Sequence, residues 1–235
     1  MLNSTLQIKL KERLNKLDSQ DFDNIECWQF IEAFNKAQTE WVRRQLHGNN
    51  LYKEADEYSK RRIDDLQVLL TETPLTGTSN DEFFESSNFP VDDYMEYKRI
   101  SVDATSSCCP DKRSMTVYLV REENIDLYQR DPLKRPDFDW SETLATMLNN
   151  TVRIYKNADF NLVDPVLTYY RRPTYIQILD CTNPYTGETS IEEVECEFKD
   201  DIVEVILDEA ASILAGDMEN FSQYTREQQS AERNN

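Results

Sequence analysis

Apolar residues recur every three or four positions near the start of the chain, which is the spacing of one face of an α-helix. The first stripe predicts a helix over residues 2–17. Its apolar face is formed by Leu2, Leu6, Leu10, Leu14 and Leu17, with Ile8 beside it. Charged residues interrupt this segment throughout, so it is not typical of a signal peptide.

A second stripe lies in the segment ECWQFIEAFNKAQTEWVRRQLHG, residues 26–48. Asn35 and Gln38 interrupt the pattern, and we expect them either to hydrogen-bond to a neighbouring helix or to be exposed. The apolar face of this helix is predicted to enter the core of the protein through Trp28, Phe34 and Trp41.

Two further helices are predicted, over residues 52–70 and 200–228. Acidic residues fill one side of the second of these helices, and residues 229–235 after it are polar and expected to fray. Its apolar side is predicted to comprise Ile202, Val205, Ile206, Ala210, Ile213, Met218 and Phe221.

The middle of the chain contains short segments rich in Tyr, Val, Ile and Thr, which predict β-strands. These segments are YMEYKRISVDATS (94–106), MTVYLVRE (115–122), TVRIYKN (151–157), VLTYYRRP (166–173) and TYIQILDC (174–181). The segment WSETLATMLNN, residues 140–150, is predicted to form a short helix.

The expected fold class is therefore α+β. The N-terminal helices and the C-terminal helix are predicted to form a helical bundle, with a β-rich middle insertion. The predicted parts are an N-terminal helical part (1–75), the β-rich insertion (82–198), and a C-terminal helix with a frayed tail (199–235) that packs on the N-terminal helices.

The composition argues against several classes of enzyme. With only 4 glycines in 235 residues, the chain contains no GxGxxG, GxxxxGK[ST] or GxSxG motif for a phosphate-binding loop or a nucleophile elbow. The single histidine, His47, lies at a predicted helix end, where a solvated cation suits the helix dipole. We therefore expect no enzymatic activity, no catalytic residue, no cofactor and no bound metal.

The formal net charge is −19, and it is distributed unevenly. Residues 1–50 balance 7 acidic against 7 basic side chains, whereas residues 188–235 carry 14 acidic and 3 basic ones. Because an acidic surface repels the phosphate backbone, this charge does not predict nucleic-acid binding. No apolar run approaches membrane-spanning length, so no membrane partner is expected.

The five cysteines form no CxxC pair, and their number is odd. Free, buried thiols in a reducing compartment are therefore expected. The cysteines are Cys27, Cys108, Cys109, Cys181 and Cys196.

Several segments occur in an order that resembles a known family. IEAFNKAQTEWVRRQL (31–46) is followed by DDLQVLL (64–70), and TYYRRP (168–173) comes after NTVRIYKN (150–157). With the closing DIVEVILDEAASILAGDMENFSQY (201–224), this order resembles the head–tail connector proteins of short-tailed, crAss-like bacteriophages. The resemblance spans residues 20–225 and rests on the order of the segments rather than on any single motif.

The resemblance implies a structural subunit of a ring below the portal, which lines the DNA channel and joins capsid to tail. It implies a homo-oligomeric ring of twelve copies in the neck of the virion, assembled in the host cytoplasm. The portal and other ring or tail proteins would be its partners, and DNA would pass without specific binding. A closed ring needs head-to-tail contacts between copies. The candidate interface residues are Lys36, Arg43 and Arg44 on one copy, and Asp208 and Glu209 on the next.

Two other functions are left open by the sequence. An acidic binding protein that mimics DNA would fit the net charge of −19, although the first 50 residues are balanced. A metal-dependent nuclease would use the E-x-K motif at Glu197 and Lys199, with Asp137 upstream, to hold a divalent ion. This motif arises easily by chance in a chain of which 30% is charged.

Overall fold

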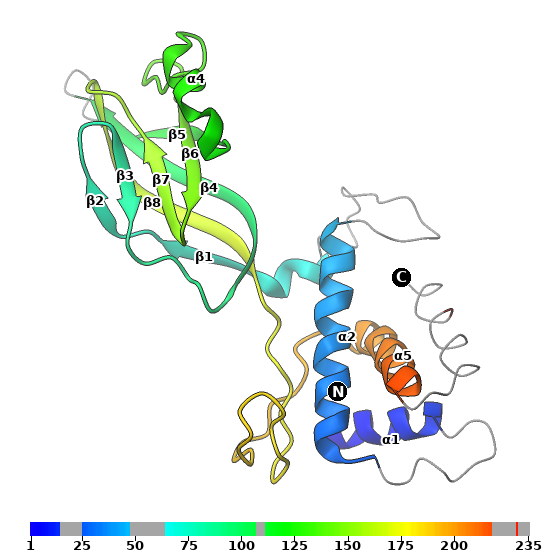
Figure 1. The fold of residues 1–235 in the computed structure, drawn as a ribbon. Coiled ribbons are helices and arrows are strands. Elements are labelled where there is room, and N and C mark those ends of the chain that lie inside the picture. Colours follow the sequence, from blue (N-terminus) through cyan, green and yellow to red (C-terminus); the bar gives the residue numbers. More distant parts are fainter. Residues whose placement is uncertain (15–24, 48–63, 107–110, 218–228, 230–235) are drawn as a thin grey trace. The chain divides into compact units, whose positions relative to one another are not determined.

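The computed structural model describes residues 1–14, 25–47, 64–106, 111–217 and 229 (Figure 1). The chain divides into two compact units. The helical unit joins Met1–Val68 to Pro173–Asn235, and the sheet unit is the continuous stretch Leu69–Arg172.

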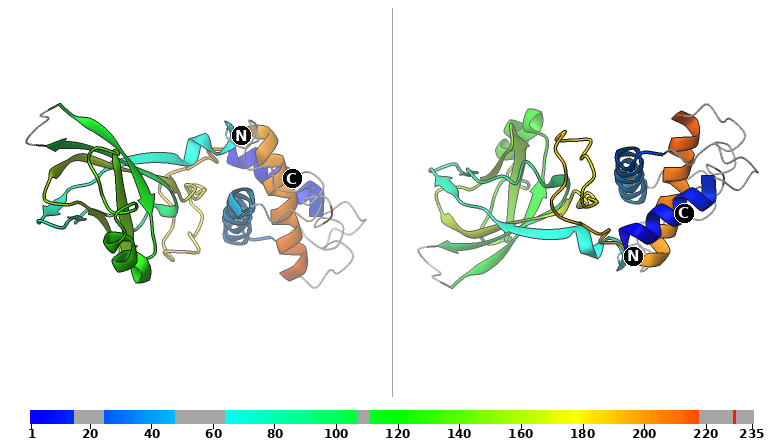
Figure 2. Two further views of the ribbon diagram at one scale, coloured as in Figure 1. Left: turned by 90° about the horizontal axis from the view of Figure 1, so that it is seen from above. Right: turned by 90° about the horizontal axis from the view of Figure 1, so that it is seen from below.

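The sheet unit is built on one eight-stranded sheet that curls into a half-barrel (Figures 1 and 2). The strands lie in the spatial order β1-β8-β4-β5-β6-β7-β3-β2. Neighbouring strands are antiparallel, except for the parallel pair β5 and β6. The strands are β1 Leu70–Pro74, β2 Gly77–Ser79, β3 Phe83–Ser86, β4 Tyr94–Ser106, β5 Arg113–Leu119, β6 Glu142–Leu148, β7 Thr151–Tyr155 and β8 Phe160–Arg171.

The two longest strands, β4 and β8, pair side by side and account for much of the curl. Three register shifts interrupt their ladder, and irregularities of this kind bend a strand and increase its twist. Ile100, Val102 and Ala104 alternate along β4 and are buried, as expected for one face of a strand. They belong to a continuous core with Leu75, Phe84, Met115, Phe138, Ala145, Val152, Ile154, Phe160, Leu167 and Tyr169.

The predicted architecture, a helical bundle with a β-rich insertion, is wrong. The main element of the described chain is the curled sheet, and the helices beside it are few: α1 Asn3–Leu14, α2 Cys27–His47, α4 Ile125–Arg130 and α5 Asp200–Asp217. In the helical unit, α1 and α2 each pack against α5 and make few contacts with one another. The described chain is therefore mostly sheet, because the strands of its middle part join into one eight-stranded sheet rather than a minor insertion in a bundle.

Within these helices the predicted apolar stripes are only partly correct. Trp28 is 40% exposed, and Leu2 and Ile8 are also exposed, so none of the three enters the core. α5 is buried on more than the one predicted side, since Val203, Leu207 and Ala211 are all 0% exposed. A helix that contacts both α1 and α2 needs apolar residues on two faces. The predicted core residues that are buried are Leu6, Leu10, Leu14, Phe34, Trp41, Ile202, Ile206 and Ala210.

The predicted strands at residues 94–106, 115–122, 151–157 and 166–173 are confirmed as β4, β5, β7 and β8. The predicted helix over residues 140–150 is wrong, because this stretch contains β6, which is paired on both sides. A short buried apolar run fits either a helix or a strand, and here the two neighbouring strands decide.

The predicted strand over residues 174–181 is also wrong. Gln177 pairs with Val194 in an isolated bridge, and the rest of the segment is irregular. It is held instead by side-chain amides on the helices. Asn35 accepts the N–H of Ile176 (2.9 Å) and donates to its carbonyl (3.4 Å), while Gln38 donates to the carbonyl of Thr174 (3.1 Å).

A third amide, on α1, completes this set of contacts. Asn3 Nδ2 donates to the carbonyls of Gln177 (2.9 Å) and Val194 (3.1 Å), the two residues of the bridge. Asn3, Asn35 and Gln38 are each 0% exposed. We call these three side chains the amide clamp. Asn35 and Gln38 are therefore neither exposed nor bonded to another helix, but support an extended segment.

Cys27 and Cys181 form a disulfide that joins the first residue of α2 to the irregular segment. The expectation of free thiols is therefore wrong for these two residues. Cys196 is free and buried, and desolvation raises the pKa of its thiol to about 11.

Several predictions fall wholly or partly outside the described residues. They include the thiols of Cys108 and Cys109, most of the helix over residues 52–70, the end of the C-terminal helix with Met218 and Phe221, and the fraying of residues 230–235. The described end of the 52–70 segment departs from the prediction, because Leu70 begins β1.

Replacing Asn35 by alanine is expected to lower the free energy of unfolding by about 2–4 kcal/mol, since the buried N–H and carbonyl of Ile176 lose their partner. Lys36→Ala, at an exposed position on the same helix, is the control and should shift stability by less than about 0.5 kcal/mol. Urea denaturation of both variants measures the difference. Equal stabilities would show that the amide clamp does not support the segment.

Candidate interaction surface

The connection between β5 and β6 carries the most exposed apolar side chains in the described part of the sheet unit. It comprises the 3₁₀ turn η3 Glu122–Asn124, the helix α4 and the loop that follows, and α4 projects at one end of the sheet (Figure 1). Leu133 is 87% exposed, Trp140 78% and Leu127 67%. We call these three side chains the crossover surface. Exposed apolar patches mark interaction sites, and these three side chains share one connection between strands, which makes it the candidate surface.

Hydrogen-bonded turns hold two of these side chains in place. Asp131 Oδ1 accepts the N–H of Leu133 at 3.0 Å. Asp137 Oδ1 accepts the N–H groups of Asp139 at 2.8 Å and Trp140 at 3.1 Å. The backbone that carries Leu133 and Trp140 is therefore locally fixed, so little conformational entropy would be lost when a partner binds.

The third side chain is exposed because α4 is amphipathic. Ile125 packs with Leu144 of β6 and Tyr155 of β7. Leu127 lies two residues further along the helix, which places it about 200° around the axis and away from the sheet. The guanidinium of Arg113 lies 4.7 Å from the ring centre of Phe138, which attaches the loop before Trp140 to β5.

The five residues predicted at subunit contacts divide into two groups. Lys36 and Arg43 are exposed on α2, and their place in a subunit contact remains a prediction. The other three form ion pairs within the chain: Arg44 with Glu209, and Asp208 with Arg13.

Further ion pairs fasten α1 to the acidic side of α5. Lys9 and Arg13 both pair with Glu204, and Arg13 Nε lies 2.6 Å from Asp208. Burial raises the pKa of Glu204, but Lys9 and Arg13 together lower it more, so the pKa lies below its ordinary value. Three bases of residues 1–50, Lys9, Arg13 and Arg44, are therefore matched by carboxylates of α5 within the same chain.

Glu209 is the most perturbed carboxyl group of this unit. Its side chain is 5% exposed. Desolvation raises its pKa to about 7, against the lowering effect of Arg44 and with a smaller raising effect of Glu40. Arg44 Nη1 and Glu209 Oε2 are both buried without a hydrogen-bond partner among the described residues, so this pair is incompletely satisfied.

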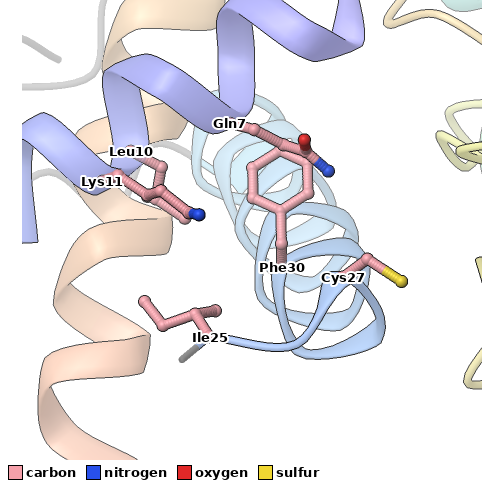
Figure 3. A pocket seen from close by; sticks show the side chains of 6 residues that line it. All are labelled: Gln7, Leu10, Lys11, Ile25, Cys27 and Phe30. Carbon is pink, nitrogen blue, oxygen red and sulfur yellow. The ribbon is translucent and has the colours of Figure 1, made fainter. Parts of the chain in front are cut away.

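Two small hollows lie between the helices. One, of about 210 Å³, is lined by Gln7, Leu10, Lys11, Ile25, Cys27 and Phe30 (Figure 3). The other, of about 250 Å³, lies between α2 and α5, with Trp28 and Lys36 on one side and Ile213 and Leu214 on the other. Neither lining places a nucleophile beside a general base.

The residues of the nuclease alternative make structural contacts. Glu197 accepts the N–H of Thr174 at 2.9 Å, and Lys199 pairs with Asp64. Asp137 belongs to the other unit and holds the turn before Trp140. Within the described ranges, no group of three or more His, Cys, Asp or Glu side chains is placed to hold a metal ion. None of the described helices has the length and apolar content needed to cross a membrane.

The crossover surface was not anticipated from the sequence. Leu127, Leu133 and Trp140 belong to no apolar stripe, and two prolines, Pro132 and Pro136, mark the segment as a loop. In the sequence, the signal that points to this surface is the presence of large apolar residues within a segment that its prolines mark as a loop.

Comparison with known protein families and with curated protein sequences finds no match for this chain.

Glu209 is expected to make the protein more stable at pH 5 than at pH 8. Because its pKa is raised in the folded protein, its stabilising contribution is complete below the unfolded value near 4.5 and is lost as the pH rises through about 7. Glu209→Gln should remove this slope, because glutamine does not titrate. Denaturation midpoints measured across this range provide the test.

Glu204→Gln is the matched control, because the pKa of Glu204 is lowered rather than raised. This variant should be less stable than the parent at neutral pH, with a difference that disappears as the pH falls below the ordinary carboxyl range. Parallel pH curves for the parent and Glu209→Gln would contradict the assignment of the slope to Glu209.

Proposed function

We propose that this chain is a structural subunit of the head–tail connector of a crAss-like bacteriophage. Its copies form a ring below the portal, line the DNA channel and join the capsid to the tail. In this proposal the protein acts by assembly and performs no chemistry. The portal and the neighbouring ring or tail proteins are its partners, and the neck of the virion is its location.

The observation that carries the proposal is the crossover surface. Leu127, Leu133 and Trp140 are all more than two-thirds exposed, and local hydrogen bonds fix the turns that carry the last two. Tryptophan is among the residues enriched at the energetic centre of protein–protein interfaces, and Trp140 is the candidate for that place here. The resemblance in segment order supports the connector as the particular assembly.

The charges of the helical unit agree with a channel that DNA passes without adhering. Lys9, Arg13 and Arg44 are engaged by carboxylates of α5, so they are not available to bind phosphate groups. The net charge of −19 opposes retention of duplex DNA. The same ion pairs speak against a DNA mimic, which would present these carboxylates to a basic partner.

Substitution of the crossover surface should weaken binding to the portal while the fold is kept. Leu133→Ala combined with Trp140→Ala is expected to weaken binding to the purified portal by about tenfold or more, because both side chains would be buried in the contact. Sedimentation with the portal measures binding, and thermal unfolding verifies that the variant is folded.

Ile191→Ala is the control, since Ile191 is 86% exposed but lies in the helical unit. It should bind the portal like the parent. Equal binding by parent and crossover variant would remove the role of this surface, and failure of the parent to bind any portal would reject the connector itself. The isolated parent should not retain duplex DNA at ~150 mM salt.

A further inference from the structure

The stretch 178–193 in the helical unit is a loop that closes on itself. Its base is the pair Gln177 and Val194, whose backbone groups exchange two hydrogen bonds at 3.1 and 2.9 Å. Within the loop, Cys181 and Ser190 are also hydrogen-bonded across it, because the N–H of Ser190 donates to the carbonyl of Cys181 at 2.8 Å. The hydrogen bonds that the structure gives for the backbone of this loop all end within the loop or at its base.

The amide clamp makes its backbone hydrogen bonds outside this loop. Gln38, Asn35 and Asn3 reach Thr174, Ile176, Gln177 and Val194, which are residues before the loop or at its base. Beyond the base, the disulfide between Cys27 and Cys181 is a direct covalent attachment of the loop to α2. Tyr185 adds weaker, noncovalent contacts. Its ring stacks on Tyr175 at 4.8 Å between centroids, and its side chain interacts with Asn35 of α2.

We propose that the disulfide between Cys27 and Cys181 is a redox latch, whose reduction releases the loop 178–193 from α2 while the amide clamp keeps the rest of the helical unit folded. The proposal is independent of the connector function. The released loop carries the exposed apolar side chains of Leu179 and Tyr185, so the latch sets the position of these groups.

The reductant is a low-molecular-weight thiol. Cys181 is 2% exposed and Cys27 is half-buried, so the entering thiolate attacks the sulfur of Cys27. The S–S bond breaks, Cys181 leaves as a thiolate, and a mixed disulfide forms on Cys27. A second thiol molecule then attacks the mixed disulfide, and a small-molecule disulfide is released. Two electrons pass from the two small thiols to the cystine, and their two protons end on Cys27 and Cys181.

Two features keep the exchange confined to this pair. The remaining described thiol, Cys196, is 7% exposed, and burial raises its pKa, so it is not present as the attacking thiolate. Cys27 is also one of the residues that line the hollow with Lys11 and Gln7 (Figure 3).

Hydrogen exchange measured by mass spectrometry on the full chain tests the latch, with and without dithiothreitol. Reduction should accelerate exchange in peptides covering 178–193 by roughly tenfold or more, whereas peptides from α2 and the amide of Ile176 should be unchanged. Cys181→Ser should exchange like the reduced parent under both conditions. Cys196→Ser, the control, should still respond to dithiothreitol. Alkylation under native conditions should label Cys27 and Cys181 only after reduction.

Three results would overturn the proposal. The first is unchanged exchange in the loop after alkylation proves that the disulfide has been reduced. The second is equal loss of protection in the loop and in α2, which would make the disulfide a support of the whole unit. The third is alkylation of Cys27 and Cys181 in protein that has never been exposed to a reductant. If Cys181→Ser does not fold, the reduced parent and Cys27→Ser give the same comparison.

Discussion

The helical unit depends on side-chain amides that satisfy an irregular stretch of buried backbone. A segment that is neither helix nor strand cannot pair its own N–H and carbonyl groups, and burying them unpaired is unfavourable. Asn3, Asn35 and Gln38 provide these partners from two different helices. Because α5 begins at Asp200, soon after the supported segment, the position of that segment also helps to set where α5 can meet α1 and α2.

Local patterns predicted individual elements better than they predicted their arrangement. The alternation in residues 94–106 identified β4, and the leucine spacing identified α1, because each pattern follows from the geometry of one element. The predicted architecture was wrong because separate strand patterns do not show that all the strands join into one large sheet, which is the main element of the described chain. Residues 140–150 were wrong because their apolar run suits two structures, and only the strands on either side of β6 select one.

The candidate site was less accessible to sequence reasoning than the fold. Opposite charges on α2 and α5 suggested contacts between subunits, yet Arg44 and Glu209 meet within one chain. The sequence alone does not show whether two oppositely charged residues pair within one chain or between two subunits. Ile125 and Leu127 are both apolar residues of α4. The packing of α4 on the sheet buries Ile125 and leaves Leu127 exposed.

The division of the chain has a consequence for the order in which its parts form during synthesis. α1 and α2 leave the ribosome first, but α5, on which both pack, comes after the whole sheet unit. The sheet unit is one continuous stretch and can close while α1 and α2 still lack their partner. Until translation reaches Asp217, the sides of α1 and α2 that pack on α5 in the folded protein remain exposed to solvent or chaperones. The apolar faces of α1 and α2 thus stay without their partner until the last described helix has been made.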